Sequence, residues 1–98
     1  MSDEGTEQRS VRVHITGRVQ GVGYRVWALD NARALGLGGW VRNRRDGAVE
    51  ALLSGGEGQV LEMIARCHKG PPGAFVMKVA IVEYVGERHS SFRVLPTA

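Results

Sequence analysis

The chain has 98 residues, of which 43% are apolar, and a formal net charge of +3, which suits one soluble globular domain and an anionic ligand without requiring nucleic acid. No apolar run approaches the roughly 20 residues of a membrane span, and the N-terminus lacks the apolar core of a signal peptide, so we expect a cytoplasmic protein. The single cysteine, Cys67, excludes an internal disulfide and any metal site built from paired cysteines.

The N-terminal part of the chain predicts a tail followed by a strand. Residues 1–10 have no apolar side chain after Met1 and cannot bury enough surface to offset the entropy of ordering. We therefore expect a flexible tail before a single domain over residues 11–98. Apolar and polar residues alternate over residues 11–16, and this period of two predicts a strand. Its core-facing residues are Val11, Val13 and Ile15.

A glycine-rich connection leads from this strand into a helix expected over residues 26–35, where apolar residues recur at helical spacing. The connection reads Gly17-Arg18-Val19-Gln20-Gly21-Val22-Gly23-Tyr24-Arg25. Glycine permits φ above zero and lets another group approach the main chain closely. The N-terminus of a helix presents unpaired N–H groups and a partial positive charge. Together with the guanidinium of Arg25, these features predict an anion cradle that suits a phosphate.

Two better-known phosphate motifs do not fit the connection. No Gly-Lys-Ser or Gly-Lys-Thr sequence is present, so the nucleotide-binding P-loop is excluded. The dinucleotide fingerprint would need a third glycine where Val26 stands. On their own, the glycines and Arg25 also fit a tight turn followed by a solvated arginine.

The rest of the chain predicts a hairpin, a second helix and two strands. The expected elements are strands over 40–44 and 48–54, a helix over 57–68, and strands over 76–85 and 91–95. Asp46-Gly47 is a strong hairpin signal between the first two of these strands. The second helix should bury an apolar face, and Cys67 is expected to be a small core residue on it. That face comprises Val60, Leu61, Ile64 and Cys67.

The order strand-helix-strand-strand-helix-strand predicts an α+β fold of the ferredoxin-like βαββαβ type. In this sandwich, two helices cover one face of an antiparallel sheet, and a short extra strand follows at the C-terminus. The loop that leaves the first strand should lie at one end of the sheet. The second strand should bring Asn43 to the same end.

Three blocks of the sequence resemble the acylphosphatase family. The connection over residues 17–25 is similar to the family signature G-x-V-Q-G-V-x-[FY]-R. The second block is Gly39-Trp40-Val41-Arg42-Asn43 followed by Asp46-Gly47, and a weaker third is Lys69-Gly70-Pro71-Pro72-Gly73-Ala74. The resemblance covers nearly the whole chain after residue 10 and implies the ferredoxin-like fold and an acylphosphatase activity.

The available side chains restrict the chemistry that the chain could perform. The three histidines are scattered without ligand spacing, so we expect no metal and no cofactor. Glu50, Glu57 and Glu62 are expected on solvated faces, and no Ser-His-Asp arrangement is visible. Hydrolysis of an acyl phosphate requires no general acid, because its leaving carboxylate has a conjugate acid with a pKa of about 4 to 5. A site that binds the phosphate and positions water could therefore suffice, and the resemblance implies a metal-independent hydrolase that yields a carboxylate and inorganic phosphate.

The family resemblance implies a role for each site residue. Arg25 would hold the phosphoryl oxygens together with main-chain N–H groups, and Asn43 would position the attacking water. The N–H donors implied are those of Gln20, Gly21, Val22, Gly23, Tyr24 and Arg25. The expected partner is a small-molecule acyl phosphate, with phosphate or sulfate as a competing anion. We expect a monomer that binds neither nucleic acid nor a membrane.

A non-catalytic ferredoxin-like module that binds an anion or RNA is the alternative function. Fold alone does not decide between a module and an enzyme. RNA recognition on such a sheet uses exposed aromatic residues on the central strands. The first strand offers only Arg12, His14 and Thr16 on its open side, which fits RNA binding poorly.

Overall fold

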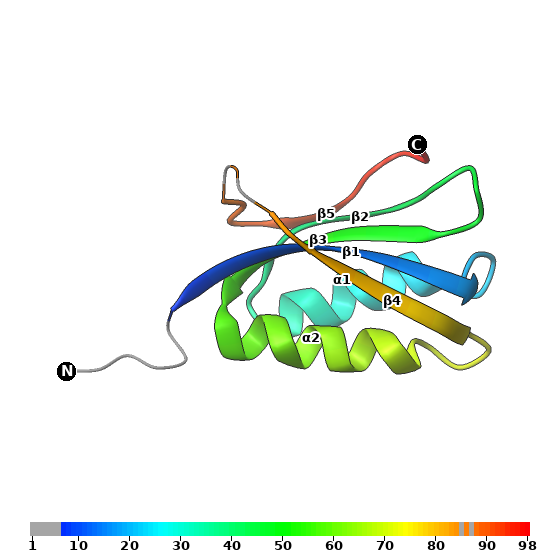
Figure 1. Cartoon of the computed structure of the whole chain (residues 1–98), viewed down its shortest axis with the longest axis horizontal. Coiled ribbons are helices and arrows are strands. Elements are labelled where there is room, and N and C mark those ends of the chain that lie inside the picture. Colours follow the sequence, from blue (N-terminus) through cyan, green and yellow to red (C-terminus); the bar gives the residue numbers. More distant parts are fainter. Residues whose placement is uncertain (1–6, 85, 87) are drawn as a thin grey trace.

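The computed structural model of the chain describes residues 7–84, 86 and 88–98, and it has the predicted ferredoxin-like α+β fold. Its elements are β1 (Gln8–Arg18), α1 (Tyr24–Ala34), β2 (Gly38–Asn43), β3 (Val49–Gly56), α2 (Glu57–Lys69), β4 (Phe75–Glu83) and β5 (Phe92–Val94). The two helices lie side by side on one face of the sheet (Figure 1). Within the described part of the chain, no helix is long and apolar enough to cross a bilayer.

The sheet has the strand order β4-β1-β3-β2-β5. The four strands from β4 to β2 pair antiparallel, as predicted. The extra strand β5 pairs parallel with β2, so the complete sheet is mixed rather than purely antiparallel. The pairings make β4 run opposite to β2. After β4 the chain crosses to the other edge of the sheet and runs back, so β5 has the same direction as β2.

The first strand begins earlier than the sequence predicts. Gln8 pairs with Gly56 in β3, and the hydroxyl groups of Ser10 and Ser54 are 2.8 Å apart. The carbonyl of Ser10 also accepts a hydrogen bond from the Tyr84 amide. Residues 8–10 therefore belong to the sheet and not to a tail, because backbone pairing holds them without apolar side chains. Residues 1–6 of the expected tail lie outside the described residues.

The hydrophobic core lies between the sheet and the helices. The predicted core residues of β1 are fully buried, and so are most of the predicted residues of α2. Leu61 is the exception, since it is 50% exposed, and Met63 takes its place in the core. The buried positions of α2 are Val60, Met63, Ile64 and Cys67, which follow the i, i+3, i+4, i+7 pattern of a single helical face.

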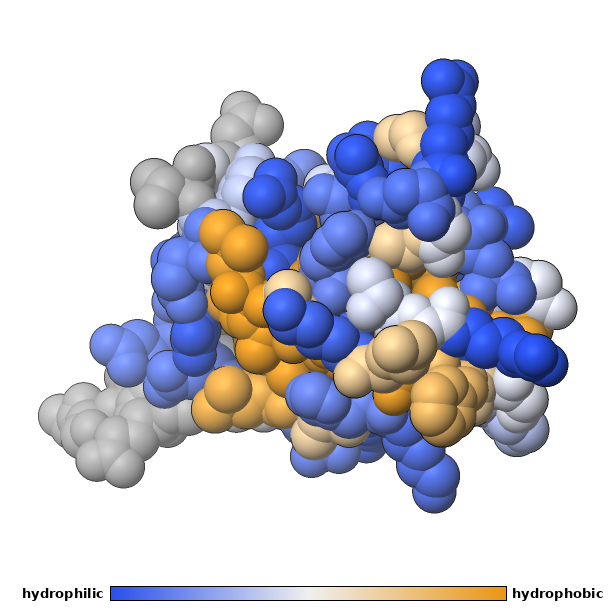
Figure 2. Space-filling model, turned by 45° about the vertical axis from the view of Figure 1, so that its right-hand side comes forward, coloured by the Kyte–Doolittle hydropathy of each residue, from blue (hydrophilic) through white to orange (hydrophobic). Residues whose placement is uncertain are grey.

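The edge of the sheet that β4 forms is more apolar at its surface than the sequence suggests. β4 carries four large apolar side chains that are exposed, namely Phe75, Met77, Ile81 and Val82. Apolar side chains form a visible patch on the side of the molecule where β4 runs (Figure 2). β4 ends at Glu83, and the predicted strand end at Val85 lies outside the described residues.

Candidate active site

The connection between β1 and α1 lies at the same end of the sheet as the turn between β2 and β3 (Figure 1). Gly21 has φ of 77° and Gly23 has φ of 81°, in the left-handed region that favours glycine. Gly23 is the N-cap of α1, and no side chain caps this helix end. The first amide groups of α1 are therefore available to an anion, and the helix dipole adds a partial positive charge.

A cavity of about 150 Å³ lies beside this helix end. Its lining residues are Val19, Gln20, Gly21, Gly23, Tyr24, Arg25, Val26, Asn43 and Val94. The structure thus brings Arg25 and Asn43 into one cavity, together with most of the residues expected to donate main-chain N–H groups. Val22 is the exception, because its side chain packs against the core and the residue does not line the cavity.

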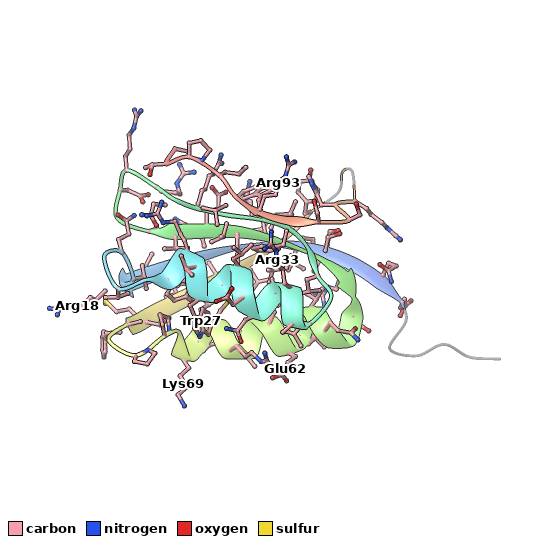
Figure 3. All side chains as sticks on the ribbon, turned by 180° about the vertical axis from the view of Figure 1, so that it is seen from behind. Arg18, Trp27, Arg33, Glu62, Lys69 and Arg93 are labelled. Atoms are coloured by element: carbon pink, nitrogen blue, oxygen red, sulfur yellow. The ribbon has the colours of Figure 1, made fainter. Side chains whose placement is uncertain are left out.

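Arg25 enters the cavity without a neutralising partner. Its side chain is half-buried, and among residues 7–84, 86 and 88–98 no carboxylate pairs with it. No acidic residue lines the cavity. Arg18 of the same connection extends away from the body of the molecule (Figure 3). The charge available to a bound anion therefore comes from Arg25 and the helix end.

The side chain of Gln20 ties the connection to the strands that carry Asn43. Its Nε2 donates hydrogen bonds of 2.8 Å to the carbonyls of both Arg44 and Ala48. The Arg44 amide donates to the same Ala48 carbonyl across the turn. These contacts fix the glycine-rich connection relative to Asn43. The sequence predicted a role only for the main-chain N–H of Gln20. The role of its side chain was missed because the two partners are 24 and 28 residues away.

Tyr24 anchors the start of α1 to the end of α2. Its hydroxyl donates a 2.6 Å hydrogen bond to the carbonyl of Cys67, and its ring meets that of Trp27 edge-on with centroids 5.1 Å apart. Burial raises the pKa of Tyr24 above its ordinary value, so the phenol stays protonated. Burial also raises the pKa of the Cys67 thiol to about 11. Cys67 is therefore a core residue, as predicted, and not a reactive thiolate.

Glu50 corrects one sequence expectation, because it is buried and not on a solvated face. It is 5% exposed on β3, and it accepts hydrogen bonds from Arg42 Nε at 2.9 Å and Arg44 Nη1 at 3.0 Å. Arg12 Nε of β1 lies 3.6 Å from its other oxygen. Burial by itself raises the pKa of Glu50, but the two hydrogen-bonded arginines outweigh it and hold that pKa below its ordinary value. This network braces the two residues that flank Asn43.

Three further features of the described residues lie outside this cavity. His14 Nε2 lies 4.0 Å from Asp46 Oδ2, outside hydrogen-bond reach. In the described ranges, no group of three or more His, Cys, Asp or Glu side chains could hold a metal ion. A larger cavity of about 640 Å³ lies between the helices and residues 70–74, and it contains none of the expected site residues. Trp27 lies between the two helices at this place (Figure 3).

The fold and the cavity define a ferredoxin-like α+β protein with a cavity at one end of its sheet that Arg25, Asn43 and the glycine-rich connection line. The acylphosphatase family model matches residues 11–94. This chain belongs to the acylphosphatase family, and it is an acyl phosphate hydrolase.

Curated relatives and solved structures agree with this assignment. The acylphosphatase of Rhodopseudomonas palustris strain BisB5 is 54% identical over 88 residues, which cover 81% of this chain and 89% of that protein. The acylphosphatase of Rhizorhabdus wittichii is 45% identical over 86 residues, covering 88% and 87% of the two chains. The structure of an acylphosphatase from Coxiella burnetii superposes with a TM-score of 0.88 at 34% identity, covering 97% of this chain and all of that one.

Proposed function

We propose that hydrolysis takes place in the cavity shared by Arg25 and Asn43, without a metal ion or other cofactor. The observation that carries the proposal is the placement of Arg25, which pairs with no carboxylate of the described residues, and an uncapped helix end beside the carboxamide of Asn43. The substrate is a small acyl phosphate. The bond that breaks joins the phosphorus to the carboxyl oxygen.

The phosphoryl group is held by charge and by preorganised amides. The Arg25 guanidinium forms two hydrogen bonds to non-bridging oxygens, a geometry that suits its planar fork. Main-chain N–H groups over residues 20–25 supply further donors at the positive end of α1. Phosphoryl transfer spreads negative charge over these same oxygens, so the donors stabilise the transition state directly.

Asn43 supplies the second half of the mechanism by positioning water. Its side chain hydrogen-bonds the water and aligns it opposite the acyl oxygen. The water oxygen forms a bond to phosphorus while the phosphorus–acyl oxygen bond breaks, and the carboxylate leaves with the electron pair. One water proton passes to a non-bridging oxygen of the phosphoryl group and the other stays on the attacking oxygen, so the product is inorganic phosphate. No general acid is needed, because a carboxylate leaves readily at neutral pH.

Inorganic phosphate and sulfate should compete with substrate for the same donors. We further propose that the protein is monomeric and works in the cytoplasm, where the single thiol of Cys67 stays reduced. The open face of the sheet does not favour the RNA-binding alternative, because Arg42 lies over the ring of Trp40 at 4.7 Å and covers it. The RNA-binding mode needs such rings to be free for base stacking.

The test is a hydrolysis assay with benzoyl phosphate and p-nitrophenyl phosphate, each with and without EDTA. We expect rapid cleavage of benzoyl phosphate, little cleavage of the monoester and no effect of the chelator. The monoester is the control, because its phenolate is a poorer leaving group than a carboxylate and gains more from an acid or a metal. Loss of activity in EDTA, or equal rates on both substrates, would contradict the mechanism.

A further inference from the structure

Two valines outside the phosphate-binding machinery line the cavity of the candidate site. Val26 is 62% exposed and Val94 is 42% exposed, whereas Val19 and Tyr24 in the same lining are almost fully buried. A buried lining residue forms the floor of a cavity, and an exposed one forms its mouth. Val19 and Tyr24 therefore lie at the floor, and the mouth has the two valines beside the exposed Gly21 and Gly23.

The two valines come from opposite ends of the chain. Val26 follows Arg25 directly in the first turn of α1. Val94 lies in β5, where it pairs with Val41 of β2, two residues before Asn43. The tertiary structure thus brings both valines into the cavity that Arg25 and Asn43 line. Apart from Arg25, no residue that lines the cavity has a charged side chain.

We propose that Val26 and Val94 form the binding surface for the acyl group and select substrates with a compact apolar acyl group, aryl or branched alkyl. The inference rests on the proposed function, which holds the phosphoryl group inside the cavity. The acyl group must then project through the mouth, past the two valines. An apolar acyl group covers valine surface that is otherwise in water, whereas a charged acyl group gains nothing from it.

The experiment compares benzoyl, acetyl and succinyl phosphate as substrates of three proteins. These are the wild type, the double variant Val26→Ala/Val94→Ala and the control Val82→Ala. Val82 is 48% exposed on β4 and does not line the cavity, so it matches the two valines in exposure only. Inhibition by inorganic phosphate reports separately on the phosphate-binding part of the site.

We expect the double variant to raise KM for benzoyl phosphate about three- to tenfold, less than the 10–200-fold effect of a methylene group in a closed pocket, because the mouth is open. Its kcat/KM for acetyl phosphate and its inhibition by phosphate should change less than twofold. The control should match the wild type on all three substrates. The wild type should prefer benzoyl to succinyl phosphate.

Three results would overturn the inference and leave the proposed function intact. They are an unchanged KM for benzoyl phosphate, an equal loss on benzoyl and acetyl phosphate, and a wild-type preference for succinyl phosphate. Failure of the wild type to hydrolyse any of the three substrates would instead reject the proposed function, and the inference with it.

Discussion

Two regions of the molecule carry arginine side chains, and they differ in whether a carboxylate neutralises the charge. On the open face of the sheet, Arg12, Arg42 and Arg44 surround the buried carboxylate of Glu50. At the end of the sheet, Arg25 lines the cavity, and the described residues provide no carboxylate to pair with it. The same residue type thus braces the strands in one region, and in the other we propose that it binds the ligand.

The difference shows how the fold keeps a charge free for a ligand. Glu50 pairs with the arginines on both sides of Asn43, and these ion pairs hold β2 and β3 together. The two cations are therefore neutralised and do not compete with Arg25 for the phosphoryl group. Arg25 keeps its donors because neighbouring positions in the connection are glycine or apolar. Variants of the two regions should therefore separate, with activity lost in one and stability lost in the other.

The largest effect is expected for Arg25→Ala. The variant should lose about 10³- to 10⁵-fold in kcat, the range of a transition-state arginine in phosphoryl transfer. Binding and turnover should fall together, because in the proposed mechanism Arg25 contacts the phosphoryl group in both the ground state and the transition state. Kinetics and phosphate titration calorimetry measure the two effects. Arg25→Lys should rescue little, since it keeps the charge but not the planar fork. Phosphate affinity that survived Arg25→Ala would refute the assigned role.

The next largest effect is expected for Asn43→Ala. We expect kcat to fall because the activation free energy of turnover rises by about 2.7–4 kcal/mol, as for the loss of one preorganised donor. Phosphate should still bind, because the proposed partner of Asn43 is the attacking water and not the phosphoryl group. The matched control is Asn31→Ala, since Asn31 is a half-buried asparagine that does not line this cavity. A loss of phosphate affinity equal to the loss of kcat would assign Asn43 to the phosphoryl group instead.

Glu50→Gln should reduce stability rather than chemistry. We expect the free energy of unfolding at pH 7 to fall by about 1.5–3 kcal/mol, because hydrogen bonds to a charged, buried group are lost. The pKa of Glu50 is lowered by folding, so its stabilisation is complete above the ordinary value of 4.5 and disappears as pH falls through the lowered pKa. Urea unfolding of both proteins at pH 7 and in strong acid measures this.

The control for this variant is Glu62→Gln, which breaks a 3.0 Å pair with Arg66 on an exposed helix face. Its effect should be much smaller, because exposed pairs contribute little. A stability difference for Glu50→Gln that did not shrink in acid would show that the charge of Glu50 is not its source.

The smallest effect is expected for Gln20→Met, which keeps the length of the side chain and removes the amide. Stability should fall by about 1 kcal/mol, because the carbonyls of Arg44 and Ala48 keep backbone partners. Turnover should fall more than phosphate affinity, since the change loosens Asn43 relative to the connection. Kinetics and calorimetry on the same samples measure the split. Equal changes in the two quantities would reduce Gln20 to a structural role.

The features of this protein that could be predicted depend on residues close together in sequence. Alternation over residues 11–16 and helical spacing over residues 57–68 mark one face of each element, and these patterns led to the correct fold. The connection over residues 17–25 carries its glycines, its arginine and the start of a helix together. Its proximity to Asn43 follows from the order of the elements, since β1 and β2 must end at the same side of the sheet for this topology.

Other features depend on which residues meet across the fold, and no local pattern reports that. The sequence predicts Glu50 to be a surface residue. In the structure it is buried among three arginines from β1, β2 and the turn after β2. Leu61 fits the apolar face of α2 by spacing, yet the core lies closer to Met63.

Pairing across the sheet likewise decided the early start of β1, the parallel direction of β5 and the position of Val94 at the mouth of the cavity. Periodicity tells which side of an element is apolar, because it depends only on neighbours in sequence. The identity of the group that covers each side comes from contacts between distant residues, and only the tertiary structure decides those.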